Sequence, residues 1–288
     1  MSSARTIGFI GAGHIGEPMV ERLLAAGHTV RVYARRPEAR DRLASVGAQL
    51  VDTVRDIAAT DAVVSCLYSD AQILDVLPEV VAAMGQDTVL LSHTTGAPTT
   101  LDRLAAYAPG GRAAIVDAAF SGTPEAVRAG RLTVFLGGER AHLVTARQIV
   151  AAYADPVVPT GPRGSALRVK LLNNLLFAAI SQATLAAVAA GRAMGVTQGA
   201  LLDALAVSSG GSAAASYIAA RGGAERYAVT IAPFLAKDLD ACRVLAAEAG
   251  VDLGTLLTAA HNGPLDLGTT ATRQRDDHPT TNGGTPFP

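Results

Sequence analysis

The stretch Ile7-Gly-Phe-Ile-Gly11-Ala-Gly13-His-Ile-Gly16-Glu-Pro-Met19 decides the fold of this 288-residue chain. An apolar, β-branched run over residues 6–10 leads directly into the glycine-rich turn, and a helical pattern over residues 17–26 follows it. In a G-x-G-x-x-G turn the first glycine allows a tight bend, the second lets the backbone approach a pyrophosphate, and the third lets strand and helix pack closely. Amides at the start of the helix then face the anion. The stretch therefore predicts a dinucleotide site with contacts at Gly11, Gly13, His14, Ile15 and Gly16.

The alternation of strand and helix continues beyond this turn to about residue 159. Short β-branched runs predict buried strands over residues 6–10, 29–33, 62–65, 88–91, 114–117 and 132–136. Helical patterns lie between them, over residues 17–26, 37–46, 70–83 and 100–106. This alternation predicts a doubly wound parallel sheet of the Rossmann type, with helices on both faces.

The pattern changes after residues 156–162, and no convincing strand follows. Stretches rich in alanine and leucine predict helices over residues 165–190, 197–207, 213–220, 233–249 and 254–262. Pro233 suits the first turn of its helix, and Gly250 suits the position just past the end. We therefore expect a sheet domain over residues 1–161, an all-helical domain over 162–266 that starts with a long interdomain helix, and a polar, disordered tail over 267–288.

The end of the second predicted strand favours one form of the cofactor. An NAD site of this type usually has Asp or Glu there, to bind the ribose hydroxyls. This strand instead ends Val32-Tyr33-Ala34-Arg35-Arg36, with two guanidinium groups and no carboxylate. An arginine can hold a 2′-phosphate through charge-assisted hydrogen bonds, whereas a carboxylate would repel it. We therefore expect NADP in preference to NAD, with Arg35 on the phosphate and Arg36 stacked on the adenine.

The first helix of the second domain carries a candidate catalytic pair. Lys170 and Asn174 are four residues apart and share one helix face, and Gly161 and Gly164 leave room for a ligand at the helix start. An apolar run follows Lys170, so partial burial would lower the pKa of its amine toward neutrality and suit it to proton transfer. A lysine at a helix start is also commonly just solvated. The spacing alone leaves both interpretations open.

Composition and charge narrow the class of protein. Hydrophobic residues make up 49% of the chain and charged residues 17%, which is enough apolar side chain for a large core. With 24 basic and 25 acidic residues the net charge is −1, so neither nucleic acid nor an anionic membrane is expected as a partner. Cys66 and Cys242 have apolar neighbours and are expected to be reduced thiols. Residues 1–5 show no signal-peptide pattern, and we expect a cytoplasmic protein.

Neither a metal site nor a membrane span is expected. The six histidines have no metal-ligand spacing, and His93 is expected to be a polar surface residue. Residues 171–190 are apolar enough to suggest a membrane helix, but they are interrupted by Asn173, Asn174, Ser181, Gln182 and Thr184. These polar groups would be costly in lipid, so a helix buried by protein on all sides is the expected structure.

Four blocks of the chain, in order and spacing, resemble the β-hydroxyacid dehydrogenase family, which includes 3-hydroxyisobutyrate dehydrogenase and tartronate semialdehyde reductase. The resemblance extends from Ile7 to about Ala260. Its blocks are the glycine turn, Asp117-Ala-Ala-Phe-Ser121-Gly122, residues 161–174 and Lys237-Asp238-Leu239. It implies hydride transfer between a nicotinamide and a small β-hydroxy acid or its oxo counterpart. It also implies a doubly wound sheet, a long interdomain helix and a helical domain that dimerises.

The same resemblance assigns roles to individual residues. It implies Lys170 as the general acid and base, with Asn174 assisting it. Ser121 and the Gly122 amide would bind the substrate carboxylate, with Thr123 beside them. Further cofactor contacts are implied at Cys66, Leu67, Thr95 and Lys237.

Three departures from the family pattern bear on the substrate. Ala166 stands where the catalytic block usually has a glycine, Thr123 stands where the substrate block has a second glycine, and Ala119-Phe120 replaces Pro-Val. We interpret these as a change of preferred substrate within the class. Two alternatives stay open: an imine reductase, which typically lacks the lysine, and a non-catalytic dinucleotide sensor or scaffold. The alanine- and leucine-rich helices also predict a homodimer or larger homo-oligomer, which would cover their apolar faces.

Overall fold

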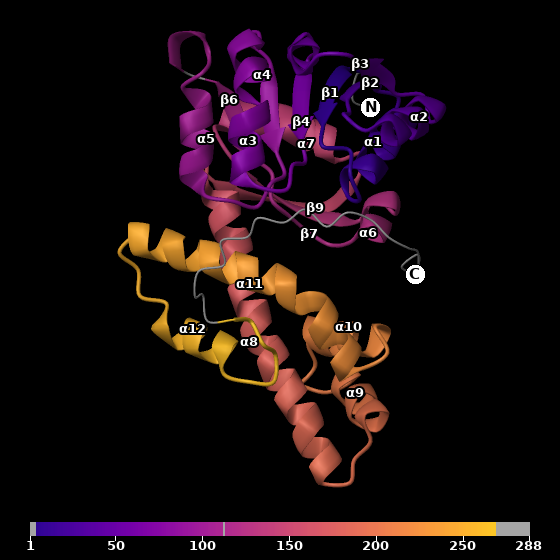
Figure 1. Cartoon of the computed structure of the whole chain (residues 1–288), viewed down its shortest axis with the longest axis vertical. Coiled ribbons are helices and arrows are strands. Elements are labelled where there is room, and N and C mark those ends of the chain that lie inside the picture. The colour runs from indigo at the N-terminus through magenta and orange to yellow at the C-terminus, as the bar shows by residue number, and fades with distance from the viewer. Residues whose placement is uncertain (1–3, 112, 269–288) are drawn as a thin grey trace.

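The computed structural model describes residues 4–111 and 113–268, which form a sheet region up to residue 161 and a helical region after it (Figure 1). The strands of the sheet are β1 (Thr6–Ile10), β2 (Thr29–Tyr33), β3 (Gln49–Val51), β4 (Ala62–Ser65), β5 (Val89–Ser92), β6 (Ala114–Asp117), β7 (Phe120–Ser121), β8 (Leu132–Gly137) and β9 (Ala154–Gly161). The helices of this region are α1 (Gly16–Ala25), α2 (Pro37–Ser45), α3 (Asp70–Val76), α4 (Pro78–Ala83), α5 (Pro98–Ala105), α6 (Pro124–Arg128) and α7 (Arg140–Val150).

The strand order confirms the doubly wound architecture. The order is β3-β2-β1-β4-β5-β6-β8-β7, with β9 on the other edge of β8, and the pairing is parallel from β3 through β6. Because β1 pairs with both β2 and β4, the chain reverses its direction of winding between β1 and β4. Ligands of such sheets bind beyond the carboxyl ends of the strands at this point.

Several sequence-based predictions for this sheet were incomplete. β8 runs antiparallel to β6, so the sheet is not parallel throughout. β3 and β7 are too short, at 3 and 2 residues, to show a periodic pattern. β9 contains Pro156 and Pro159, which argue against a strand; among the described residues it pairs only with β8, and such an edge tolerates proline. α6 and α7 were also missed, and the helix predicted over residues 70–83 is divided at Leu77, because Pro78 starts α4.

The helical region is built around one long helix. Its helices are α8 (Ser165–Ala193), α9 (Gln198–Ala206), α10 (Ala213–Ala220), α11 (Ala224–Glu248) and α12 (Gly254–His261). Figure 1 shows α8 running from the sheet down through this region, and the others pack along it. The prediction that Pro233 starts a helix was wrong, because Pro233 lies inside α11. The helix continues through Pro233 because this residue is exposed. Proline has no N–H to bond the Val229 carbonyl, but Val229 is 80% exposed, so water can bond that carbonyl instead.

α8 is the one helix among the described residues whose length and composition would allow it to cross a membrane. Its polar side chains are satisfied inside the protein. Ser181 Oγ lies 2.7 Å from the Tyr227 hydroxyl, and Gln182 bonds the carbonyls of Ala260 and Leu265 at 3.0 and 2.8 Å. Leu265 and Leu267 are buried beside it, while residues 269–288 of the predicted tail lie outside the described residues. These contacts are those of a core helix on one side. The expectation that this helix is buried on all sides was wrong, because Val169, Leu172 and Leu176 are exposed on its other side.

Candidate active site

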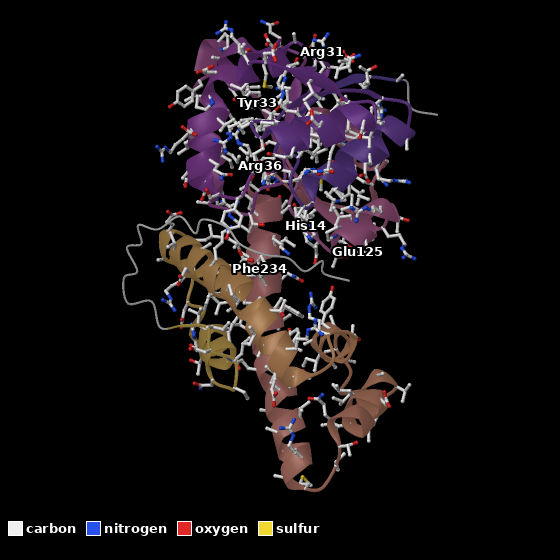
Figure 2. The ribbon with its side chains drawn as sticks, turned by 45° about the vertical axis from the view of Figure 1, so that its right-hand side comes forward. His14, Arg31, Tyr33, Arg36, Glu125 and Phe234 are labelled. Atoms are coloured by element: carbon white, nitrogen blue, oxygen red, sulfur yellow. The ribbon has the colours of Figure 1, made fainter. Side chains whose placement is uncertain are left out.

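The sheet and helical regions enclose a cleft of about 720 Å³ beyond the carboxyl ends of β1, β4 and β5. Figure 2 shows His14 at the edge of the sheet region and Phe234 on the helical region below it. Fourteen of the predicted site residues line this cleft or lie in its glycine turn: Gly11, Gly13, His14, Ile15, Gly16, Cys66, Leu67, Thr95, Ser121, Gly122, Thr123, Lys170, Asn174 and Lys237. Arg35 and Arg36 do not line the cleft; both are exposed at the end of β2.

The glycine turn has the space that a pyrophosphate requires. Gly11 has φ +89°, and a Cβ there would stand 2.3 Å from the carbonyl oxygen of Cys66. A Cβ at Gly16 would stand 2.2 Å from the carbonyl oxygen of Gly11. At Gly13, in contrast, a Cβ would meet none of the described atoms within 4 Å. The backbone is therefore packed tightly at two glycines and open to the cleft at the middle one, which fits a dinucleotide.

The segments that follow β4 and β5 continue the wall of the cleft that begins with the glycine turn. The Cys66 amide donates to the Ile10 carbonyl at 2.8 Å, and Thr94 Oγ1 donates to the Leu67 carbonyl at 2.9 Å. Burial raises the pKa of the Cys66 thiol to about 12, so this side chain is a neutral wall group and not a nucleophile. Cys66 and Cys242 are both free thiols.

The expectation that His93 lies on the surface was wrong. His93 is 1% exposed, and its ring nitrogens contact the Ala118 carbonyl and the Tyr153 hydroxyl, the latter at 2.9 Å. Burial lowers the pKa of His93 to about 4, so the ring is neutral. It packs edge-on against Phe120, 6.0 Å between ring centroids, and thereby supports the wall of the cleft.

Lys170 and Asn174 meet Asp238 on the opposite helix. The Asn174 amide donates to Asp238 Oδ2, and Asn174 is 8% exposed. Burial lowers the pKa of Lys170 below its usual 10.5, while the negative charge of Asp238 acts in the opposite direction. Burial raises the pKa of Asp238, opposed by the bond from Asn174 and by the charge of Lys170. The cleft therefore places an amine and a carboxyl group close together, and burial moves the pKa of each toward neutrality.

Lys237 joins the two walls of the cleft. Its Nζ donates to the backbone carbonyl of Tyr68 at 3.0 Å and lies 4.5 Å from the centroid of that ring. Tyr68 follows β4 in the sheet region, whereas Lys237 lies on α11. Lys237 therefore fixes the spacing of the cleft beside Asp238.

The Ser121–Thr123 segment leads from β7 into α6. Gly122 has φ +143°, and a Cβ there would stand 2.9 Å from Leu132 Cδ1, so a glycine is required. The Thr123 hydroxyl accepts from the Ala126 amide at 3.4 Å and caps α6. Thr123, one of the departures interpreted as a change of preferred substrate, thus also has a structural role.

Sequence reasoning missed the role of Asp117. This carboxylate is fully buried and accepts from the amides of Gly164, Ala166 and Leu167 at 2.7, 2.8 and 3.1 Å. These are unpaired donors at the start of α8, the helix that carries Lys170. Asp117 lies 47 to 50 residues before these amides in the chain. A pattern among neighbouring residues therefore does not reveal that it caps α8.

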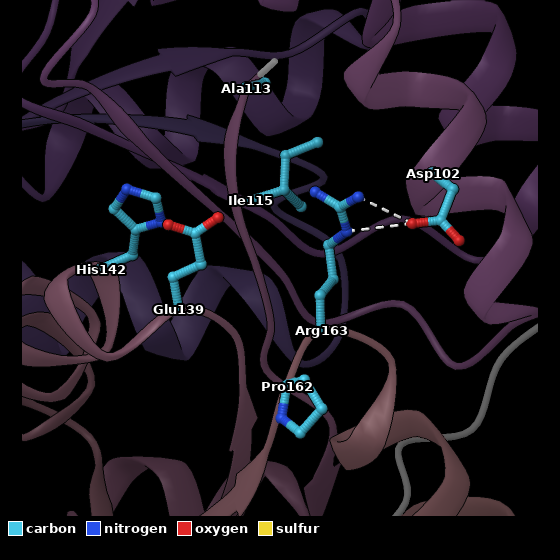
Figure 3. Close-up of a pocket in the computed structure, with 7 residues that line it drawn as sticks. All are labelled: Asp102, Ala113, Ile115, Glu139, His142, Pro162 and Arg163. Atoms are coloured by element: carbon cyan, nitrogen blue, oxygen red, sulfur yellow. Dashed lines mark hydrogen bonds and ion pairs between the residues drawn. The ribbon is translucent and has the colours of Figure 1, made fainter.

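A second, smaller hollow of about 280 Å³ lies away from these residues (Figure 3). Arg163 donates from Nε and Nη2 to Asp102 at 3.1 and 2.7 Å, so its cation is already paired. Glu139 and His142 line the other side. The hollow contains none of the predicted site residues. Among the described residues no group of three or more His, Cys, Asp or Glu side chains is placed to hold a metal ion.

Both regions match known families. Residues 6–161 match the model described as the NAD binding domain of 6-phosphogluconate dehydrogenase. Residues 164–278 match the model described as the NAD-binding domain of NADP-dependent 3-hydroxyisobutyrate dehydrogenase. The chain is 32% identical over 212 residues to an NAD-dependent L-serine dehydrogenase from Pseudomonas aeruginosa, covering 72% of this chain and 71% of the relative.

Solved structures show the same fold. A 3-hydroxyisobutyrate dehydrogenase from Mycobacterium tuberculosis, described together with L-serine, superposes with a TM-score of 0.80 at 24% identity, over 90% of this chain and 92% of that one. An imine reductase from Streptomyces aurantiacus has a TM-score of 0.62 at 18% identity, over 88% and 92%. At these identities the two structures establish the architecture alone.

Proposed function

This chain belongs to the β-hydroxyacid dehydrogenase family, and we propose that it interconverts a small β-hydroxy acid and its oxo or semialdehyde counterpart with NADP as cofactor. The observation that carries this proposal is the half-buried Lys170 amine, facing the same cleft as the open Gly13 turn and Ser121. The substrate class follows from a carboxylate-binding segment beside that amine.

Different residues of the cleft bind the substrate and transfer the proton. When bound, the nicotinamide supplies or accepts the hydride. Ser121 Oγ and the Gly122 amide hold the substrate carboxylate by hydrogen bonds, which brings the carbinol carbon toward the reacting face. In oxidation, neutral Lys170 Nζ takes the hydroxyl proton; in reduction, the protonated amine returns a proton to the carbonyl oxygen. Asn174, held by Asp238, donates to or orients the same oxygen.

Arg35 and Arg36 support NADP as the form of the cofactor. Both are exposed at the carboxyl end of β2, where the adenosine ribose of a dinucleotide lies in this fold, and neither makes a side-chain hydrogen bond to the described residues. The neighbouring Arg40, in contrast, has protein partners. It donates to the carbonyls of Ala34 and Val51 at 3.4 and 3.0 Å and forms an ion pair with Asp52. One similar relative is an NAD-dependent enzyme, so the decisive comparison is between NADPH and NADH.

Arg35→Asp tests the cofactor and with it the proposed function. We expect NADPH affinity to fall about 10- to 100-fold, because a charge-assisted bond to the 2′-phosphate is replaced by repulsion, and NADH affinity to change little. Isothermal titration with each nucleotide measures both. Arg55→Asp, the same charge change at an exposed position outside the cleft, is the control. Equal NADPH affinity in the Arg35 variant and the wild type would contradict the assignment, and binding of neither nucleotide by the wild type would contradict the proposed function.

Asp238→Asn tests the proton transfer. Oxidation requires the neutral amine, so kcat/KM for oxidation rises with pH and levels off above the pKa of Lys170. The charge of Asp238 raises that pKa against the lowering effect of burial. Without this charge the pKa falls further, so we expect the rise to move to lower pH. Oxidation rates between about pH 5 and 10 measure the shift. An unmoved profile, or one moved to higher pH, would show that Lys170 is not the titrating base.

An imine reductase is the second candidate, favoured by the shared fold. The Lys170–Asn174–Asp238 arrangement favours the hydroxy-acid reaction, since it offers a proton acceptor for a hydroxyl. NADPH-dependent reduction of cyclic imines faster than that of any semialdehyde would reverse this order.

We also propose a homodimer in the cytoplasm. The α8 residues Val169, Leu172 and Leu176 are 37%, 45% and 49% exposed and lie on one face of that helix. A second copy of the chain would cover this apolar stripe. A monomer in light scattering at micromolar concentration would contradict the dimer.

A further inference from the structure

Apart from the polar group formed by Lys170, Asn173, Asn174, Lys237 and Asp238, the helical wall of the cleft is apolar except at one residue. Phe177 on α8 and Tyr217 on α10 pack edge-on with ring centroids 5.9 Å apart, and Ile231 and Leu235 on α11 complete the surface. Arg221, just past the end of α10, lines the same wall. A guanidinium in such surroundings keeps its charge and is only partly hydrated, so it attracts an anion strongly.

Arg221 contacts an aromatic ring and not a carboxylate. Its Cζ lies 5.3 Å from the centroid of the Tyr217 ring, and the residue is half-buried. No carboxylate of the described residues forms an ion pair with it. The ring contact uses none of the guanidinium N–H groups as hydrogen-bond donors to the described residues, so they remain available for bidentate hydrogen bonds.

Four other arginines near helix C-termini have protein partners, whereas Arg103 and Arg147, in the last turns of α5 and α7, have none among the described residues. A cation there offsets the helix dipole, and this alone can account for an arginine. In the four partnered cases Arg22 bonds the Ala152 carbonyl, Arg42 bonds the Glu17 carboxylate, and Arg128 and Arg192 form longer ion pairs with Glu21 and Glu225. Arg221 differs from these because the space in front of it is the cleft itself.

The charged residues of the cleft also include one cation without a counterion among the described residues, and a second anionic group on the substrate could supply one. Lys170, Lys237 and Arg221 are the lysines and arginines that line it, and Asp238 is the carboxylate that lines it. Lys237 bonds the Tyr68 carbonyl and Asp238 accepts from Asn174. One substrate carboxylate is accounted for by Ser121 and Gly122, which leaves Arg221 without a counterion.

We propose that Arg221 binds a second carboxylate of the substrate, at the end remote from the reacting carbon, so that the preferred substrates are β-hydroxy dicarboxylates. This inference rests on the proposed function, since it assumes that a hydroxy acid occupies the cleft. A planar guanidinium matches a carboxylate in a bidentate geometry, and the aromatic wall packs the methylene groups between the two anionic ends. Monocarboxylates of equal size would leave the guanidinium desolvated and unpaired.

A matched pair of substrates tests the proposal. 2-(Hydroxymethyl)butanedioate carries a second carboxylate, and 2-(hydroxymethyl)-4-methylpentanoate has an uncharged branch of the same shape. We expect the wild type to oxidise the dicarboxylate with a kcat/KM about 10- to 100-fold higher, mainly through a lower KM. In Arg221→Gln this ratio should fall about 10- to 100-fold, and Arg221→Lys should retain part of it. Arg226→Gln, an exposed arginine on α11 that does not line the cleft, should leave the ratio unchanged.

The outcomes separate this inference from the proposed function. Oxidation of the monocarboxylate with no preference for the dicarboxylate would overturn the role of Arg221 and leave the dehydrogenase activity standing. An unaltered ratio in Arg221→Gln would do the same. Oxidation of neither acid, with NADP or NAD, would overturn both.

Discussion

Lys170→Met should lower kcat for hydroxy-acid oxidation by about 100- to 10,000-fold, the range that general acid and base catalysis supplies. Methionine keeps the length of the side chain and removes the amine that shares a helix face with Asn174 and lies near Asp238 in the described cleft. The glycine turn lies on the opposite wall, so NADPH affinity should stay within about twofold of the wild-type value. Stopped-flow absorbance at 340 nm measures the chemistry, and calorimetric titration measures the affinity.

Lys237→Met is the informative comparison for this experiment. Lys237 lies in the same cleft but bonds a backbone carbonyl of Tyr68, so its loss should widen the cleft and raise KM without removing the base. The pH dependence of the residual rate should then persist in Lys237→Met and vanish in Lys170→Met. Full turnover in Lys170→Met would refute the catalytic assignment, and a protein that binds NADPH but oxidises no hydroxy acid before mutation would be better described as a dinucleotide sensor.

Local signals in the sequence predicted the architecture because each of them is complete within a few residues. The glycine turn after β1 fixes its own geometry, through the positive φ of Gly11 and the close contact at Gly16. The strand and helix periods up to α5 are equally local. A lysine and an asparagine one turn apart share a helix face in any context, so the pairing of Lys170 with Asn174 needed no tertiary information.

Features that depend on distant residues could not be predicted in this way. His93 looks like a polar loop residue until Tyr153, 60 residues later, supplies its partner. β9 looks like a proline-rich linker until its pairing with β8 makes it an edge strand, a position in which prolines are tolerated. The role proposed for Arg221 depends on its contact with Tyr217 and on its position in the cleft, and the position in the cleft cannot be predicted from neighbouring residues. In each case the chemical type of the residue is evident from the sequence, but its role depends on contacts with residues that are distant along the chain.

Asp117→Ala should destabilise the protein by about 3 kcal/mol or more, because it leaves three buried amides at the start of α8 without an acceptor. The carboxylate is 0% exposed, and a Cβ at Gly137 would stand only 2.7 Å from its oxygens, so the group is tightly enclosed by protein. Burial raises the pKa of Asp117, and the hydrogen bonds from these amides act in the opposite direction by stabilising the carboxylate. Urea unfolding at neutral pH measures the change in stability.

The same substitution should also lower activity, since Asp117 fixes the first turn of the helix that carries Lys170. Asp117→Asn keeps the shape and one accepting oxygen, so its loss of stability should be smaller than that of the alanine variant. Thr197→Ala removes a comparable cap, from the Ala200 amide of exposed α9, and should cost about 1 kcal/mol with no effect on kcat. If Asp117→Ala were as stable as Thr197→Ala and equally active, the start of α8 would be held by the sheet packing alone. A variant that folds with weakened stability but greatly reduced kcat would instead show that this buried acid positions the amine, two turns away, for proton transfer.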